Sequence, residues 1–180
     1  DASSDNSKEI IESFGNLITK MYLKTNVGLA KARNIGVNIC NGKYILFLDA
    51  DDFIHRDLIY IESLFLDQNH EFDAVAVDYY TVDNTGIEID KISCEESPLA
   101  CGVMYRKEKF IETGCFDNDF RMHEDKDFRI RFTNKDFFTH RIQLPLYRYR
   151  KHNSSLTLNN RLDNKYRNKL EKKHGLNMNE

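Results

Sequence analysis

The sequence lacks long apolar runs, paired cysteines and flexible linkers. No stretch approaches the roughly 18 apolar residues that indicate a membrane-spanning helix. The four cysteines show neither CxxC pairs nor zinc-ligand spacing, which argues against those metal motifs and favours reduced thiols in a cytosolic protein. Only two prolines occur, without a Pro/Gly linker, repeat or low-complexity segment. The formal net charge of −3 gives no sign of a nucleic-acid-binding protein.

The composition is that of a folded domain. Hydrophobic residues make up 41% of the chain, and nine Tyr and twelve Phe are present, which argues against disorder. The 180 residues correspond to one domain of ordinary size.

Helix-like and strand-like patterns alternate along the first half, which predicts an α/β sheet with crossover helices. The second half is expected to add further strands and helices, with 84–97 irregular and 159–175 either a polar terminal helix or a frayed tail. The remaining expected helices cover 4–14, 29–39, 56–69, 108–114 and 124–135, and the expected strands cover 18–23, 44–48, 73–83, 99–107 and 137–152.

Three carboxylates, Asp49, Asp51 and Asp52, follow the apolar strand pattern of "YILFLDADDF". In open α/β sheets the carboxyl ends of strands bind ligands, and D-x-D spacing at a strand end can place two carboxylates on one side. A hard divalent cation completed by substrate phosphate oxygens would neutralise them. The alternative is that Asp52, and with it Asp51, caps the next helix; Asp49 does not fit that alternative.

Two other charged clusters have equally simple alternatives. In "HEDKDF", the acidic residues at a helix start either complement its dipole or supply a general base. In "YRYRKHNSS", the basic residues either bind phosphate or guard a solvated edge strand.

Taken in order, five segments resemble the inverting glycosyltransferases of family 2, which have the GT-A fold. The segments, with the family patterns in parentheses, are "DASSDNS" (D-D-G-S-x-D-x-S), "NVGLAKARNIGV" (N-x-G-x-x-x-A-R-N-x-G), "GKYILFLDADD" (G-x-Y-I-x-F-L-D-x-D-D), "GCFDNDFRMHEDKDFRIR" (G-x-F-D-E…E-D-x-D-x-x-x-R) and "YRKHNSS" (Y-R-x-H-x-x-S). The resemblance covers 1–157 and predicts a GT-A, Rossmann-like mixed sheet flanked by helices, with 158–180 as a polar helix or tail. Because the chain begins at the second Asp of the family's first motif, we expect the family's N-terminal strand–helix–strand to be absent from it.

The resemblance also implies roles for residues. Asp49 and Asp51 would form the D-x-D motif, with Asp51 as the direct ligand of Mn²⁺ or Mg²⁺ and Asp49 closer to the ribose or a metal-bound water. Asp125 would be the general base, with Glu124 beside it.

Four further residues would contact the nucleotide. Arg33 would face it, Asp1 would recognise the uracil edge, and Arg150 with His152 would lie on a loop closing over the diphosphate.

The implied function is metal-dependent transfer, with inversion, from a nucleotide sugar, with a UDP-sugar favoured. The acceptor would be a hydroxyl of a glycan or lipid-linked molecule in bacterial surface polysaccharide synthesis. The resemblance further implies a cytoplasmic protein with peripheral contact at the inner membrane face, and no nucleic-acid partner. The alternative is a non-catalytic relic of the fold that binds a nucleotide or sugar.

Overall fold

The computed structural model describes residues 1–152 and 160–176 of the chain. Its helices are α1 (Ser7–Ser13), the 3-10 turn η1 (Gly15–Leu17), α2 (Leu29–Ile39), α3 (Leu58–Gln68), α4 (Lys107–Glu112), α5 (Glu124–Thr133) and α6 (Asn160–His174). Its strands are β1 (Tyr44–Leu46), β2 (Phe53–Ile54), β3 (Ala74–Val82), β4 (Glu88–Ile92), β5 (Val103–Arg106) and β6 (Thr139–Arg150). In this described part, no helix has the length and apolar character needed to cross a membrane.

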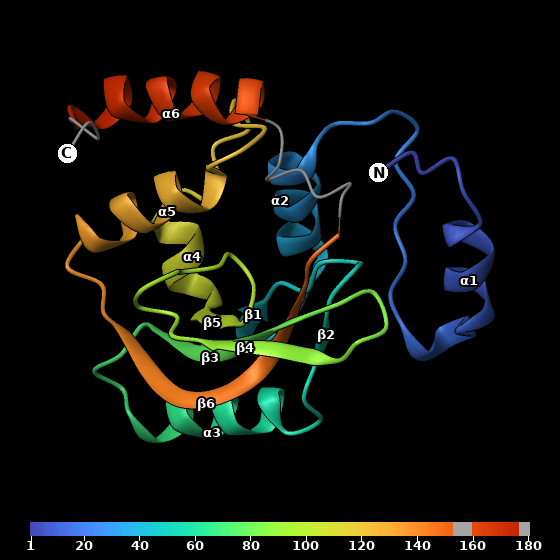
Figure 1. Ribbon diagram of the computed structural model, residues 1–180, viewed down its shortest axis with the longest axis horizontal. Helices are drawn as coiled ribbons and strands as arrows, with labels where there is room; N and C mark the ends of the chain where they lie inside the picture. Colours follow the sequence, from blue (N-terminus) through green and yellow to red (C-terminus); the bar gives the residue numbers. More distant parts are fainter. Residues whose placement is uncertain (153–159, 177–180) are drawn as a thin grey trace.

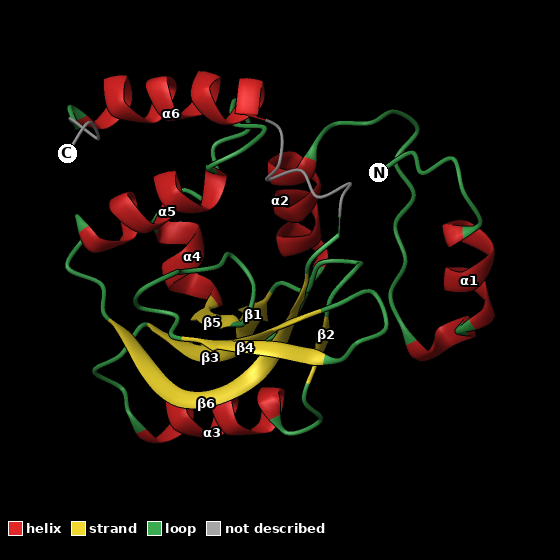
Figure 2. Ribbon diagram, in the orientation of Figure 1, coloured by secondary structure: helices red, strands yellow, loops and turns green. Residues whose placement is uncertain are grey.

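The strands form one mixed sheet in the order β1-β5-β3-β6-β2, with β4 beside β3 (Figure 2). β3 pairs in parallel with β6 along its length, while β5 and β4 pair antiparallel with the first and last parts of β3. Since β5 is antiparallel to both β1 and β3, β1 and β3 run the same way and α3 is the crossover between them. The predicted α/β fold with a mixed sheet is therefore confirmed.

Helices cover both faces of this sheet (Figure 1). On one face α3 buries Leu66 against Val75 and Met104. On the other face, α2, α4 and α5 pack through an aromatic core in which the rings of Phe110 and Phe128 stack with centroids 4.4 Å apart. Successive residues of β3 point to opposite faces, which is why this strand is apolar along most of its length.

One predicted strand is absent from the structure, and two short strands were missed. The apolar stretch 18–23 forms no strand: Ile18, Met21 and Tyr22 are exposed, and no described segment pairs with it. A strand needs a hydrogen-bonded neighbour, which the local pattern cannot supply. Conversely, β2 and β4 were not predicted, because β2 has two residues and four of the five residues of β4 are exposed.

The terminal segment 160–174 is the helix α6 rather than a frayed tail, and it packs on the rest of the domain. Tyr166 and Leu170 of α6 are buried against Phe120 and Met122, just before α5. The predicted boundary at 157 falls in 153–159, outside the described residues, as does the end of the "YRKHNSS" motif.

Candidate active site

Five of the predicted site residues line one cleft of about 510 Å³. Arg33 comes from α2, Asp49 and Asp51 from the loop after β1, and Glu124 and Asp125 from the first turn of α5. The segment 98–100, Tyr149 of β6 and Asp163 of α6 complete the walls. The fold thus brings together predicted site residues that lie up to 92 positions apart in the chain.

Arg33 lies at the centre of this cleft. Its Nη2 donates to Oδ1 of Asp49 at 2.5 Å and its Nη1 to Oε1 of Glu124 at 3.0 Å. The side chain is only 9% exposed, and its guanidinium lies against the Phe47 and Phe116 rings. The neighbouring carboxylates raise the pKa of Arg33 in spite of burial, so Arg33 is a permanent cation that joins the D-x-D loop to α5.

The adjacent carboxylates Glu124 and Asp125 point to different partners. Glu124 faces Arg33, and burial raises the pKa of its 7% exposed side chain. Asp125 accepts a hydrogen bond at Oδ2 from Nη1 of Arg129, 2.8 Å away, and its side chain is 19% exposed. Asp125 is therefore the carboxylate of this pair that is more accessible from the cleft.

Asp51 and His152, predicted to act at the same site, do meet. Nε2 of His152 lies 2.7 Å from Oδ2 of Asp51, whose side chain is 47% exposed. Asp49 is paired with a permanent cation, whereas the partner of Asp51 is a histidine. Asp51 is therefore the carboxylate of the D-x-D pair that is better placed to accept a metal ion.

The interpretation of Asp52 as a helix cap was wrong. The next helix, α3, begins six residues later and has Asp57 at its N-cap position. Asp52 instead accepts hydrogen bonds from the Tyr147 hydroxyl at 2.6 Å and from the Arg150 backbone N–H at 2.8 Å. Burial raises the pKa of Asp52. Asp52 thus fastens the acidic loop to β6.

Arg150 and Asp1, two residues predicted to contact the nucleotide, form hydrogen bonds with the protein's own backbone. The Arg150 guanidinium donates to the carbonyl oxygens of Asp51, Asp83 and Asn84 at 2.7 to 2.9 Å. The Asp1 carboxylate accepts from the backbone N–H groups of residues 27 and 28, at 2.8 and 2.9 Å. Both side chains stabilise loops beside the cleft, and their contacts with a nucleotide stay predictions.

Sequence reasoning assigned no role to His123, Cys101 or Asp163. His123 precedes α5 with the left-handed φ of 66°, and its Nε2 lies 3.0 Å from Oδ1 of Asp163. The Cys101 thiol contacts Arg33 at 3.7 Å, and burial raises its pKa to about 12. A possible signal for His123 was its place in "HEDKDF", but no local pattern could reveal Asp163, which lies 40 positions further along the chain.

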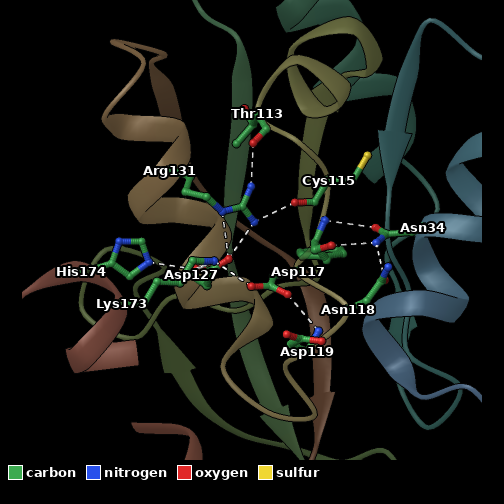
Figure 3. Close-up of polar contacts among 11 residues, drawn as sticks. Asn34, Thr113, Cys115, Asp117, Asn118, Asp119, Asp127, Arg131, Lys173 and His174 are labelled. Atoms are coloured by element: carbon green, nitrogen blue, oxygen red, sulfur yellow. Dashed lines mark hydrogen bonds and ion pairs between the residues drawn. The ribbon is translucent and has the colours of Figure 1, made fainter. Parts of the chain in front are cut away.

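A network of polar contacts joins α5 to neighbouring segments (Figure 3). The buried Asp127 of α5 lies 2.8 Å from Arg131, 2.6 Å from Lys173 and 2.8 Å from His174. Arg131 also donates to the carbonyl oxygens of Thr113 and Cys115. The network therefore connects α5, which begins with Glu124 and Asp125, both to α6 and to the loop between α4 and α5.

The described residues contain no group of three or more His, Cys, Asp or Glu side chains arranged to hold a metal ion. Mg²⁺ and Mn²⁺ sites that act on phosphates use one or two carboxylates and take the remaining oxygens from the substrate and water. Asp51, with His152 beside it, fits this kind of site, and Asp49 could join through Oδ2, because its contact with Arg33 uses Oδ1.

The arrangement of the sheet and the cleft defines an α/β protein of the GT-A type. The structure superimposes with a TM-score of 0.71 on Staphylococcus aureus TarS 1–349 in complex with UDP-GlcNAc, at 21% identity over 86% of this chain and 49% of that one. The Pyrobaculum calidifontis mannosyltransferase PcManGT, in complex with GDP-Man and Mn²⁺, gives 0.66 at 13% identity over 86% of this chain and 47% of that one.

The family model described as Glycosyl transferase family 2 matches residues 1–132, and the chain belongs to this family. Among curated relatives, the glycosyltransferase GlyG of Streptococcus pneumoniae is 33% identical over 89 residues, which cover 47% of this chain and 29% of that protein. The chain thus spans less than a third of this relative and about half of the solved TarS chain.

Proposed function

We propose that this chain forms the catalytic part of a glycosyltransferase that transfers a sugar from a UDP-sugar to an acceptor hydroxyl, with inversion and with the help of Mn²⁺ or Mg²⁺. The observation that carries the proposal is the convergence of the D-x-D loop, Arg33 and the Glu124–Asp125 pair in one cleft. The family match supports the reaction class, and the UDP-GlcNAc complex of TarS supports UDP as the nucleotide.

Asp51 would hold the metal ion with His152 beside it, and Asp49 would lie next to it. When bound, the ion would supply positive charge for the diphosphate. Arg33 lies in the same cleft and joins the D-x-D loop to the first turn of α5 through its ion pairs with Asp49 and Glu124. Its contacts with Asp49 and Glu124 keep it oriented before any substrate arrives.

Asp125 would act as the general base. As the acceptor oxygen forms its bond to the anomeric carbon, its proton passes to the carboxylate of Asp125, and the bond from the anomeric carbon to the diphosphate oxygen breaks and releases UDP. Because the nucleophile enters opposite the leaving group in a single step, the product has inverted configuration. The hydrogen bond from Arg129 to Oδ2 orients the carboxylate, and no described residue bonds Oδ1.

The acceptor class we propose is a glycan or lipid-linked molecule of a bacterial surface polysaccharide. The name of one relative supports it: TarS of S. aureus is a poly(ribitol-phosphate) β-N-acetylglucosaminyltransferase. We also propose a cytoplasmic location at the inner membrane face, in keeping with the four free cysteines. Exposed basic residues of α6, such as Arg161, Lys165 and Lys172, would make the membrane contact.

The experiment is titration of UDP and a panel of nucleotide sugars by calorimetry, with Mn²⁺ or with EDTA, followed by an assay of sugar release. We expect metal-dependent binding and slow hydrolysis of one donor. Asp51→Asn should weaken the metal-dependent binding, whereas Asp125→Asn should retain it and reduce turnover by about 10²–10⁴-fold.

The same measurements separate the alternative of a non-catalytic relic. A relic would bind UDP or sugar without turnover of any donor. Wild-type rates in Asp125→Asn would remove that residue from the role of base.

A further inference from the structure

A second hollow, of about 250 Å³, lies beside the cleft. Its walls come from β3, β5 and β6, from α5, and from the connection between β4 and β5. Pro98 and Leu99 of that connection line both the hollow and the cleft. The two spaces are therefore neighbours on either side of a short segment. We call the smaller one the α5 pocket.

One face of α5 leads from the cleft into the α5 pocket. Arg129, Phe132 and Thr133 line the pocket, and Asp125 precedes Arg129 by four residues. Residues spaced by three and four positions share a helix face. Arg129 also donates to Asp125 at 2.8 Å, so one guanidinium touches both the pocket and the proposed base.

The charges in the walls of the pocket are already paired. Arg129 is bonded to Asp125, and Arg141 is bonded through 2.8 Å contacts to Asp78 and Glu95. Burial raises the pKa of the Cys94 thiol to about 11, so this group stays neutral near pH 7. Walls of this kind offer no uncompensated charge to an ionic ligand, which favours a neutral one.

Uncharged polar groups, rings and aliphatic side chains such as Ala76, Val77 and Val103 complete the lining. Tyr105 is 5% exposed and lines the pocket, and within residues 1–152 and 160–176 its hydroxyl makes no hydrogen bond. This hydroxyl is also absent from the fully buried unpaired polar atoms of those residues, so it can be reached from the pocket and is available to a ligand. Thr133 and Thr139 add hydroxyls near the rim, where both residues are exposed. The volume lies below the range of roughly 300–1,000 Å³ typical of sites for drug-sized ligands and suits one small unit.

We infer that the α5 pocket binds a neutral, hydroxylated unit of the acceptor, a single sugar or polyol residue, and presents it to Asp125. The inference rests on the proposed function and adds the place and the chemistry of the acceptor. In this arrangement the acceptor lies along α5 and the donor lies in the cleft, so that Asp125 is between them.

The test uses the full chain and two variants of equal bulk. Thr133→Phe places a ring at the pocket rim, and Asn134→Phe places the same ring on the exposed neighbouring position, which does not line the pocket. Binding is measured by saturation-transfer NMR with methyl β-glucoside, methyl β-N-acetylglucosaminide and ribitol as neutral probes, ribitol 5-phosphate as an anionic probe and octanol as an apolar probe.

We expect at least one neutral probe to bind the wild type. Thr133→Phe should weaken that binding by about tenfold, and Asn134→Phe should change it by no more than about twofold. UDP affinity in the presence of Mn²⁺ should stay the same in both variants. If Thr133→Phe fails to fold by circular dichroism, Thr139→Phe blocks the pocket from β6 instead.

The inference is overturned if no neutral probe binds, if only the phosphate or octanol binds, or if blocking the rim leaves binding unchanged. Failure of the proposed function gives a different result. In that case the wild type would bind no UDP and hydrolyse no nucleotide sugar, whatever the neutral probes do.

Discussion

Replacing Glu62 by glutamine is expected to stabilise the protein by an amount that grows with pH. Glu62 lies on α3 with 0% of its surface exposed, and neither carboxylate oxygen has a well-formed hydrogen bond within the described residues. Burial raises the pKa of Glu62 well above its ordinary value, and the backbone of Met104 offsets only part of this effect. In the folded protein the group therefore holds its proton at pH values where the unfolded chain has lost it.

The sign follows from proton linkage. Below the unfolded pKa of about 4.3 both states are protonated, and Glu62 adds no pH dependence. As the pH rises above that value the unfolded state ionises while the folded state does not, so the free energy of unfolding falls by about 1.4 kcal/mol per pH unit until the raised folded pKa is reached. Between pH 5 and pH 7 the loss amounts to as much as about 2.7 kcal/mol. Glutamine has nearly the same shape and does not titrate.

The assay is urea unfolding, followed by circular dichroism, of the wild type and Glu62→Gln at several values from pH 5 to pH 8. The free energy of unfolding of Glu62→Gln minus that of the wild type should rise with pH. Taking this difference removes the contributions of the other titrating groups, because both proteins share them. Glu71→Gln, at an exposed position, is the control and should show a nearly constant difference. A pH-independent difference for Glu62→Gln would mean that Glu62 is ionised in the folded protein, and would refute the reasoning.

Three further substitutions test the packing around the site. Arg33→Met leaves Glu124 buried without its cation and should lower the free energy of unfolding by about 3–5 kcal/mol. Arg33→Lys should restore part of this loss. An unchanged melting temperature of Arg33→Met would contradict a stabilising role of the Arg33–Glu124 ion pair. Phe128→Ala removes a 0% exposed ring from the aromatic core and should cost about 3–5 kcal/mol in urea unfolding; a loss below 1 kcal/mol would show that the site closes up. Tyr147→Phe removes the 2.6 Å hydrogen bond to Asp52 and should cost about 1–3 kcal/mol. Equal stability of this variant and the wild type in calorimetry would show that water replaces the hydroxyl.

Local periodicity was enough to predict most of the regular structure. The helical spacing over 29–39 and 56–69 and the apolar run over 73–83 correspond to α2, α3 and β3. Each of these patterns reflects burial of one helix face, or of both strand faces, against a core, and such a pattern can be recognised without knowing the partner. The family motifs likewise consist of short segments, so the sequence alone identified the carboxylates of the cleft.

Contacts between distant segments could not be predicted in this way. The stretch 18–23 is apolar but has no strand beside it, and Asp52 follows a strand yet bonds to β6 instead of capping a helix. Whether a segment pairs depends on which neighbours the folded chain places next to it, and local propensity carries no information about them.

The individual partners of the site residues depend on the same long-range packing. Arg33 meets a carboxylate 16 positions away and another 91 positions away, and the α5 pocket gathers three strands around one helix face. The amino-acid sequence therefore established the family, the α/β class and the acidic residues of the cleft. The three-dimensional packing established that Asp49 is held by Arg33, that Asp51 faces His152 and that Asp125 is bonded to Arg129 of a second pocket, because these pairings arise only when the sheet and α5 assemble.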